Sequence, residues 1–210
     1  MDGEAGPPPT RWARSGRATA GYARTFGALV ADGADVDGEA RLADALVPRG
    51  ARILDVGSGM GRVAAALALL GHDVVAVEPD AALVAQSRAT YPDLAVIERD
   101  VLALDATVLA AHGRAAAFDL VVCVGNVLVF LAPDTERQVL ARLASLLAPG
   151  GRVLAGFHLR DAPPGARHYP PEELVADAAA AGLRVDLRAG SYELHPSNDE
   201  YAVWLLARDA

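Results

Sequence analysis

The stretch Ile53-Leu54-Asp55-Val56-Gly57-Ser58-Gly59-Met60-Gly61-Arg62 decides the fold. Its apolar start predicts a buried strand, and its three alternating glycines predict a tight turn into a helix over about 62–70. Glycines let the backbone bend without Cβ clashes and let a ligand approach the main chain closely. The free N–H groups and positive dipole end of the following helix face the same place. The stretch therefore predicts a nucleotide-binding turn.

A carboxylate follows at the end of the next apolar run. Glu78 stands 21 residues after Gly57 and closes the run Val74-Val75-Ala76-Val77. Such a carboxylate can accept two charge-assisted hydrogen bonds from a ribose diol, so the pair predicts an adenosine-containing cofactor. The alternative is that Glu78 is an exposed carboxylate at a strand end. Its negative charge would also repel a 2′-phosphate, which disfavours a phosphorylated dinucleotide.

The glycine spacing separates two classes of cofactor. A dinucleotide fingerprint, G-x-G-x-x-G, would need its third glycine at the position of Arg62. The chain instead reads D-V-G-S-G-M-G, which resembles the first motif of the class I S-adenosylmethionine-dependent methyltransferases, an acidic residue followed by G-x-G-x-G. Four further segments resemble motifs of that family in the same order, and with the first they cover about residues 51–157: V-V-A-V-E-P-D at 74–80, E-R-D-V at 98–101, F-D-L-V-V-C at 118–123 and L-A-P-G-G-R-V-L at 147–154.

The resemblance implies S-adenosylmethionine as the cofactor. The residues that it places in contact with this cofactor are Asp55, Gly57, Gly59, Gly61, Glu78, Pro79, Asp100, Val101 and Val124. Asp55 would hold the loop or reach the amino acid portion of the cofactor. Asp100 matches the carboxylate that accepts from the adenine amino group, with capping of its own loop as the alternative. Asp80 is expected to cap the helix that begins at residue 81.

The apolar pattern predicts an α/β fold with a doubly wound sheet. The last two strands have no helical pattern between them, so they are expected to form an antiparallel pair at the sheet edge. The family likewise ends a mostly parallel, seven-stranded sheet with an antiparallel C-terminal strand. Asp134 is a predicted N-cap for a helix over 134–147, and Pro171 begins another helix that stops at Gly182. The predicted strands lie near 51–56, 73–78, 94–98, 117–124, 151–157, 183–192 and 200–208.

Residues 1–50 are expected to form a helical cap, with about the first ten disordered, before a cofactor-binding domain over 51–210. Tyr22, Phe26, Leu29 and Val30 have helical spacing within 11–32, and a second helix is expected over about 38–47. The family often covers its pocket with an N-terminal helix. Trp12 and Tyr22 are thus expected either to line a lid at the substrate pocket or simply to pack on the sheet.

The methyl acceptor should meet the pocket after the fourth strand, because ligands bind beyond the carboxyl ends of parallel strands. Asn126 is the polar residue there, and it either orients the acceptor or satisfies a turn backbone. Methyl transfer needs a general base only for an acceptor that is protonated at neutral pH. His158 is the first candidate and His195 the second, although a loop histidine is often only structural.

Composition bounds the remaining function classes. The net charge of −8 argues against nucleic acid as a main partner, and no run of 18 apolar residues suggests a membrane span. No secretion signal precedes residue 10, and Cys123 is the single cysteine, which favours a cytoplasmic protein. The N/D-P-P-Y/F motif of many DNA amino-methylating enzymes is replaced by Gly-Asn-Val-Leu at 125–128, and no set of carboxylates suggests a catalytic metal.

The expected function is therefore methyl transfer to a small-molecule acceptor. An NAD-dependent oxidoreductase is a second hypothesis, which the glycine spacing and the absence of any lysine disfavour. A third is a cofactor-binding subunit without turnover. Neither the identity of the acceptor atom nor the oligomeric state is encoded in these motifs.

Overall fold

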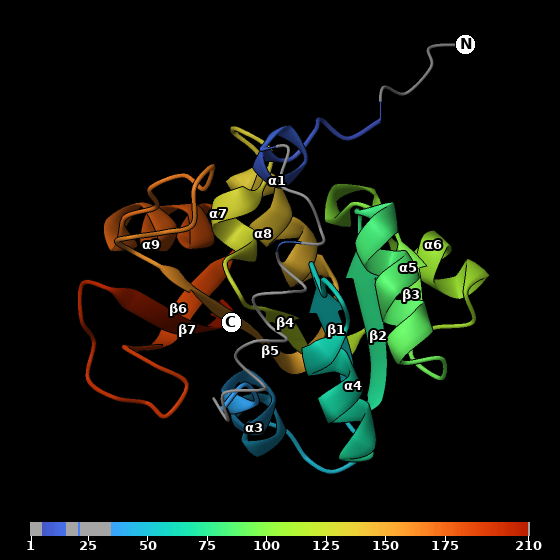
Figure 1. Cartoon of the computed structure of the whole chain (residues 1–210). Coiled ribbons are helices and arrows are strands. Elements are labelled where there is room, and N and C mark those ends of the chain that lie inside the picture. Colours follow the sequence, from blue (N-terminus) through green and yellow to red (C-terminus); the bar gives the residue numbers. More distant parts are fainter. Residues whose placement is uncertain (1–5, 16–20, 22–34, 210) are drawn as a thin grey trace.

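The computed structural model describes residues 6–15, 21 and 35–209, and strands in these residues form one seven-stranded sheet (Figure 1). The strand order is β3-β2-β1-β4-β5-β7-β6. Strand β7 runs antiparallel to both of its neighbours, and the other adjacent pairs are parallel, as the sequence predicted. The strands are β1 (Arg52–Val56), β2 (Asp73–Glu78), β3 (Ala95–Glu98), β4 (Phe118–Cys123), β5 (Leu147–His158), β6 (Leu183–Ala189) and β7 (Tyr201–Arg208).

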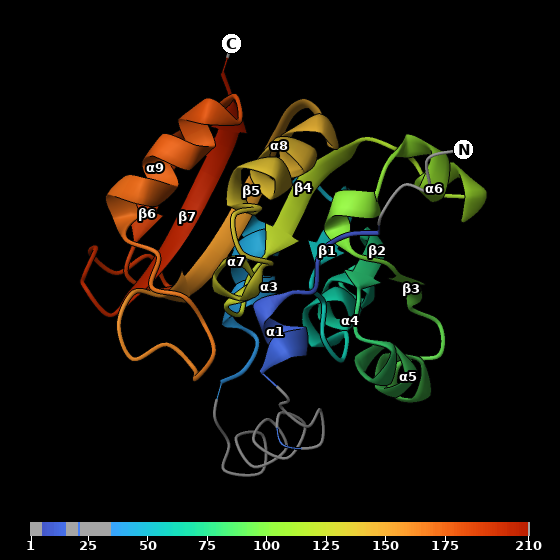
Figure 2. The same cartoon turned by 90° about the horizontal axis from the view of Figure 1, so that it is seen from above.

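Helices cover both faces of the sheet. Seen from above, α6, α8 and α9 lie on one face, and α3, α4 and α5 lie on the other (Figure 2). This three-layer arrangement confirms the doubly wound α/β fold. The described helices are α1 (Arg11–Arg14), α3 (Gly38–Ala45), α4 (Arg62–Leu69), α5 (Ala81–Thr90), α6 (Ala106–Ala111), α7 (Val127–Phe130), α8 (Glu136–Ser145) and α9 (Pro171–Ala180), with a 3₁₀ turn at Val101–Ala103.

The central strands are apolar on both sides because both sides are covered. In β1, Leu54 faces the core under α8 and α9, whereas Ile53 faces the core under α3 and α4. In β4, Val121 and Leu120 divide in the same way. Successive side chains of one strand therefore pack into two separate cores, one on each face of the sheet. Packing on both faces holds the carboxyl ends of β1, β2 and β4 in fixed positions.

Within the described residues, no helix has both the length and the hydropathy that crossing a bilayer requires.

Three boundaries differ from the sequence prediction. Strand β5 begins at Leu147 instead of 151, because Leu147 already pairs with Phe118 before a register shift that absorbs the Pro-Gly-Gly segment. Strand β6 ends at Ala189 instead of 192. The predicted N-cap at Asp134 is wrong: this residue has φ 63°, and α8 begins after Thr135. The Thr135 hydroxyl donates to the carbonyl of Ala132 at 2.8 Å, a turn that delays the start of the helix.

Other predicted helix signals are confirmed. The Asp80 carboxylate caps α5, since its Oδ1 accepts from the backbone N–H groups of Ala82 at 2.9 Å and Leu83 at 3.3 Å. Helix α3 confirms the second helix expected in the N-terminal region. Of the first expected helix, only α1 lies within the described residues. Tyr22 and the rest of its apolar stripe lie outside them.

Candidate functional site: a cleft at the carboxyl ends of the strands

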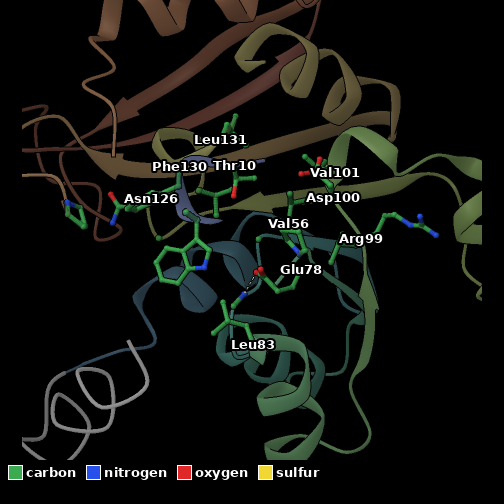
Figure 3. A pocket seen from close by; sticks show the side chains of 18 residues that line it. Thr10, Val56, Glu78, Leu83, Arg99, Asp100, Val101, Asn126, Phe130 and Leu131 are labelled. Carbon is green, nitrogen blue, oxygen red and sulfur yellow. Dashed lines mark hydrogen bonds between the residues drawn. The ribbon is translucent and has the colours of Figure 1, made fainter. Parts of the chain in front are cut away.

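A cleft of about 910 Å³ opens where β1, β2 and β4 end (Figure 3). Its walls come from the glycine turn after β1, the end of β2, the 3₁₀ turn and the segment 125–131 after β4. Residues 10 and 12 of the N-terminal segment complete it.

The glycine turn is built around left-handed backbone. Gly57 has φ 66° and Gly59 has φ 57°, a region that residues with a Cβ rarely occupy. A Cβ on Gly57 would lie 2.6 Å from Cγ2 of Val127, so the absence of a side chain also lets the turn approach α7 closely. The Gly57 N–H donates to the carbonyl of Val77 at 2.8 Å, which ties the turn to β2. Both glycines line the cleft, and their contact with the cofactor stays a prediction.

Glu78 lies at the end of β2 and is buried, which contradicts the alternative of an exposed carboxylate. Its Oε2 accepts from the backbone N–H of Gly59 at 2.9 Å (Figure 3). Its Oε1 accepts from the backbone N–H of Asp80 at 2.9 Å. Burial raises the pKa of Glu78 to about 7, and the two backbone N–H groups oppose that rise. The side chain lines the cleft with two oxygens that have further acceptor capacity.

Asp55 is buried at the end of β1 and lines a second, smaller cavity beside the main cleft. Gly57 and Val124 line the same small cavity. The Arg62 guanidinium and the backbone N–H of Ala64, both in the first turn of α4, favour the charged form of Asp55, while its Oδ2 has no hydrogen-bond partner among the described residues. Burial raises the pKa of Asp55 to about 7. A buried carboxylate oxygen without a partner is costly, which indicates that a ligand or water completes this site.

The far wall of the main cleft contains Pro79, Asp100 and Val101, three of the predicted cofactor residues. Asp100 Oδ1 accepts from the N–H of Leu102 at 2.8 Å, so the capping role is real. Burial raises the pKa of Asp100, and the Leu102 bond opposes this. Because the side chain also lines the cleft, capping and recognition of an adenine amino group are compatible; the second role stays a prediction.

Gly61 behaves differently from the other two glycines. It has φ 83° and precedes α4, but it lines neither the cleft nor the small cavity. A Cβ at this position would lie 2.9 Å from Leu94 and would collide with the hydroxyl of Ser87. Its need for glycine therefore arises from close packing against α5 and the loop after it.

Asn126 lines the opposite end of the cleft from Arg99 (Figure 3). His158 lines neither cavity, but its backbone N–H and its ring Nδ1 both lie within hydrogen-bond distance of Asn126 Oδ1. The structure therefore brings the two predicted acceptor-site residues together. His195 is exposed in the loop between β6 and β7, where its Nδ1 lies 3.0 Å from the hydroxyl of Ser191.

The N-terminal segment crosses the cleft. Trp12 lines it, and the indole packs edge-on against Phe130 of α7 with ring centroids 5.6 Å apart. The indole Nε1–H donates to Asp80 Oδ2 at 3.0 Å, and Arg11 donates to Glu136 at 3.0 Å. The lid interpretation thus fits Trp12, whereas Tyr22 lies outside the described residues.

Several site residues were not expected from the sequence. Leu83, Arg99, Phe130 and Pro163 line the cleft, and Arg62 pairs with Glu39 at 2.8 Å beside the small cavity. Leu83, Phe130, Pro163 and Glu39 lie outside the quoted motifs, and Arg62 and Arg99 lie in quoted segments in which no role was assigned to them. Their roles depend on segments that meet only after folding.

Comparison with known proteins agrees with this geometry. Residues 53–151 match the family model described as a methyltransferase domain. The chain is 31% identical to a TehB-like S-adenosylmethionine-dependent methyltransferase from Corynebacterium glutamicum, with a TM-score of 0.80 over 91% of this chain and 98% of that one. The chain belongs to the S-adenosylmethionine-dependent methyltransferases. The predicted cofactor of this methyltransferase is confirmed with the family.

Two curated relatives of the methyltransferase share part of their length with it. A ubiquinone biosynthesis O-methyltransferase from Xanthomonas axonopodis pv. citri is 33% identical over 164 residues, which are 67% of this chain and 66% of that protein. An uncharacterized methyltransferase from Mycobacterium tuberculosis is 36% identical over 113 residues, 53% of each chain. The matched segments thus span between about half and two thirds of these relatives.

The residues present fit S-adenosylmethionine. The buried Glu78 carboxylate suits a ribose diol, and the unpartnered Asp55 oxygen suits the ammonium group of the amino acid portion. The cleft and the small cavity share Gly57 and Gly125, so a ligand that touches both would run past the glycine turn.

Proposed function

We propose that this methyltransferase transfers a methyl group from S-adenosylmethionine to a small-molecule acceptor. The observation that carries the proposal is the buried Glu78 at the cleft, held by the Gly59 N–H of the glycine turn. When bound, the sulfonium supplies an electrophilic methyl group, and the acceptor attacks it in line. The protein's contribution is to bind and orient both molecules and to exclude water, an effect worth on the order of 7–11 kcal/mol when the geometry is good.

Each end of the cleft has a proposed role. Glu78, with Pro79 beside it, would hold the ribose, and Asp100 and Val101 would face the adenine. Asp55, Gly57, Gly59 and Val124 would surround the amino acid portion. Asn126 and His158 mark the acceptor end, with His158 as the candidate general base. Tyr22, the remaining predicted substrate residue, stays a prediction.

Three observations bear on the acceptor. The first two support a small molecule, and the third favours a hydroxyl group as the methylated group. The cleft is lined mostly by apolar groups with few polar ones, as in pockets for small ligands. The net charge of −8 opposes binding to a nucleic-acid backbone. The Xanthomonas relative is named as an O-methyltransferase.

The buried, unpaired Cys123 is in keeping with the cytoplasmic location expected from the sequence.

Two measurements test the proposal. Calorimetry with S-adenosylmethionine, S-adenosylhomocysteine and NAD should show binding of the first two; binding of NAD alone would reject the proposal. Incubation with labelled S-adenosylmethionine and a panel of phenols, carboxylates and amines should transfer the label to one class of acceptor. Tight cofactor binding without any labelled product would instead favour the alternative of a non-catalytic cofactor-binding subunit.

A further inference from the structure

Asn126 is held in an unusual backbone conformation at the acceptor end of the cleft. It has φ 77° and ψ 14°, in the left-handed region that asparagine tolerates better than most residues. Its backbone N–H donates to the carbonyl of Gly156 in β5 at 3.1 Å. This bond fixes the residue after β4 against the neighbouring strand and places its amide beside His158, the last residue of β5.

One oxygen of Asn126 faces two nitrogens of His158. The backbone N–H of His158 donates to Oδ1 at 2.9 Å, and the ring Nδ1 lies 3.0 Å from the same atom. A backbone N–H can only donate, so the amide atom that faces it must be the oxygen. An amide oxygen can only accept, so Nδ1 must carry a hydrogen. In a neutral imidazole the lone pair available to a proton is then on Nε2.

The surroundings of the ring keep it neutral and fixed. Burial lowers the pKa of His158, and the nearby Asp161 carboxylate opposes this effect. Tyr201 of β7 packs edge-on against the imidazole with centroids 4.8 Å apart and planes at 87°. The hydroxyls of Tyr201 and Tyr192 lie 2.9 Å apart, and burial raises the pKa of both, so neither brings a charge to the ring.

Two other charged groups among the described residues act on this cluster, and they are paired with each other. Glu39 of α3 and Arg62 of α4 act on the Tyr201 hydroxyl with opposite signs, and they form an ion pair with each other at 2.8 Å. Asp161 is therefore the charged group that acts directly on the histidine ring. The arrangement gives a neutral imidazole whose tautomer is set by a single partner.

We propose that Asn126 is a positioning residue that holds neutral His158 in the Nδ1–H tautomer. Nε2 is then free to take the proton of a hydroxyl or amine acceptor that reaches past Asn126, which lines the cleft, to the histidine ring beyond it. The inference rests on the proposed methyl transfer for its chemical role. In that step the bond between the acceptor atom and the methyl carbon forms while the carbon–sulfur bond breaks. The electron pair of the broken bond stays on sulfur, and the proton of the acceptor passes to Nε2 and then to water.

Nitrogen NMR of the ¹⁵N-labelled full chain tests the tautomer without any acceptor. The His158 ring signals are assigned by their loss in His158→Gln. Above the ring's pKa we expect a protonated Nδ1 and an unprotonated Nε2 in the wild type. Asn126→Gly keeps the left-handed backbone but removes the oxygen, so the ring should shift toward the Nε2–H tautomer. Asn126→Asp keeps an acceptor and should retain the wild-type tautomer with a raised pKa, because a carboxylate favours the charged ring. A wild-type Nε2 that carries the hydrogen, or a tautomer unchanged in Asn126→Gly, would overturn the inference.

Kinetics separates this role from the proposed function. With an acceptor identified by the product assay, Asn126→Gly should lower kcat at least tenfold with an unchanged KM for S-adenosylmethionine. Asn126→Asp should recover part of kcat and move the rising limb of the pH profile to higher pH. A wild-type enzyme that binds S-adenosylmethionine but methylates nothing would refute the proposed function. Normal turnover with the same kcat and pH profile in Asn126→Gly would refute the positioning role alone.

Discussion

Trp12 and Asp80 are joined by a hydrogen bond of 3.0 Å from the indole Nε1–H to Oδ2, although 68 residues separate them in the chain. The other oxygen of Asp80 caps α5, so one carboxylate connects the N-terminal segment to the end of β2. Because Trp12 also packs against Phe130 of α7, it bridges the two sides of the cleft. A cofactor bound beneath the indole would leave only after this bridge opens.

Removing the bridge should speed cofactor release. Trp12→Phe keeps an aromatic ring against Phe130 but removes the donor to Asp80. We expect the dissociation rate of S-adenosylmethionine to rise about three- to thirtyfold, since a hydrogen bond to a charged group contributes roughly 1.5–3 kcal/mol, part of which is lost on release. Chase of labelled S-adenosylmethionine measures the rate.

Asp80→Asn serves as the second arm and Asp105→Asn as its control. Asp105 caps α6 through Val108 at 2.8 Å, the same kind of cap, but the indole N–H of Trp12 donates to Asp80 and not to Asp105. Faster release should appear in Asp80→Asn and not in Asp105→Asn. Equal rates in all three variants and the wild type would mean that the N-terminal segment does not retain the cofactor.

Glu78 should account for a large part of the affinity for S-adenosylmethionine. Glu78→Gln replaces a charged acceptor of the ribose diol by a neutral group. We expect affinity to fall about 10- to 100-fold, because hydrogen bonds to charged groups contribute roughly 1.5–3 kcal/mol each. Isothermal titration calorimetry gives the dissociation constant. Glu98→Gln is the matched control, since Glu98 pairs with Glu78 in register on β3 but is exposed; a similar loss in both variants would argue against a specific contact.

Cofactor affinity should depend on pH. Burial raises the pKa of Glu78 to about 7, and only the ionised carboxylate accepts two hydroxyl donors with full strength. Affinity should therefore increase as pH rises from about 6 to 8. Glu78→Gln should make the affinity for S-adenosylmethionine less dependent on pH. The dependence that remains should come from ionisation of Asp55, whose pKa is also raised to about 7. A slope that is identical in wild type and Glu78→Gln would assign the titration elsewhere.

The stability of the ligand-free protein should decrease as pH rises, whereas cofactor affinity should increase. For Asp55 the folded-state pKa of about 7 lies above the ordinary value of 3.8, so the folded state binds the proton more tightly than the unfolded state. This stabilisation is fully present below about pH 4 and is lost as pH rises through 7. The free energy of unfolding of the wild type should therefore decrease between pH 5 and 8. Asp55→Asn should make this decrease smaller by on the order of 1–3 kcal/mol, measured by urea unfolding at each pH.

Gly57 should tolerate alanine less well than left-handed glycines that have no neighbour in contact do. Gly57→Ala meets both an unfavourable φ and the side chain of Val127. Gly113 and Gly50 also have positive φ, but a Cβ there would have no neighbour within 4 Å. We expect Gly57→Ala to lower the free energy of unfolding by about 1–3 kcal/mol more than either control, because overpacking adds to backbone strain.

A double variant separates the destabilisation that comes from packing against Val127 from the destabilisation that comes from backbone strain. Val127→Ala in the Gly57→Ala background should restore part of the lost stability, because it removes the methyl groups that the new Cβ meets. The destabilisation caused by the positive φ of residue 57 should remain. Equal destabilisation of Gly57→Ala, Gly113→Ala and Gly50→Ala would show that α7 yields to the new side chain.

Much of the fold could be predicted from the sequence. Strands such as β1 and β2 are continuous apolar runs bounded by glycines or charges, and these local patterns fix their positions to within a residue. The cap at Asp80 was predicted because an N-cap acts on backbone only two and three residues away. The prediction at Asp134 failed because this residue lies within the Ala132–Thr135 turn, whose local hydrogen bond competes with the helix start and has no distinct signature in the sequence.

The sequence by itself determined the glycine turn, the acid that follows it, the doubly wound α/β fold and, through its motifs, the family. These depend on interactions between near neighbours or on the alternation of apolar residues along each strand. Only the tertiary structure decided that Glu78 is buried against Gly59, that Trp12 reaches Asp80, and that Asn126 fixes the ring of His158. Each of these contacts joins the ends of different elements, and their distances follow from how the sheet and its helices pack rather than from any spacing along the chain.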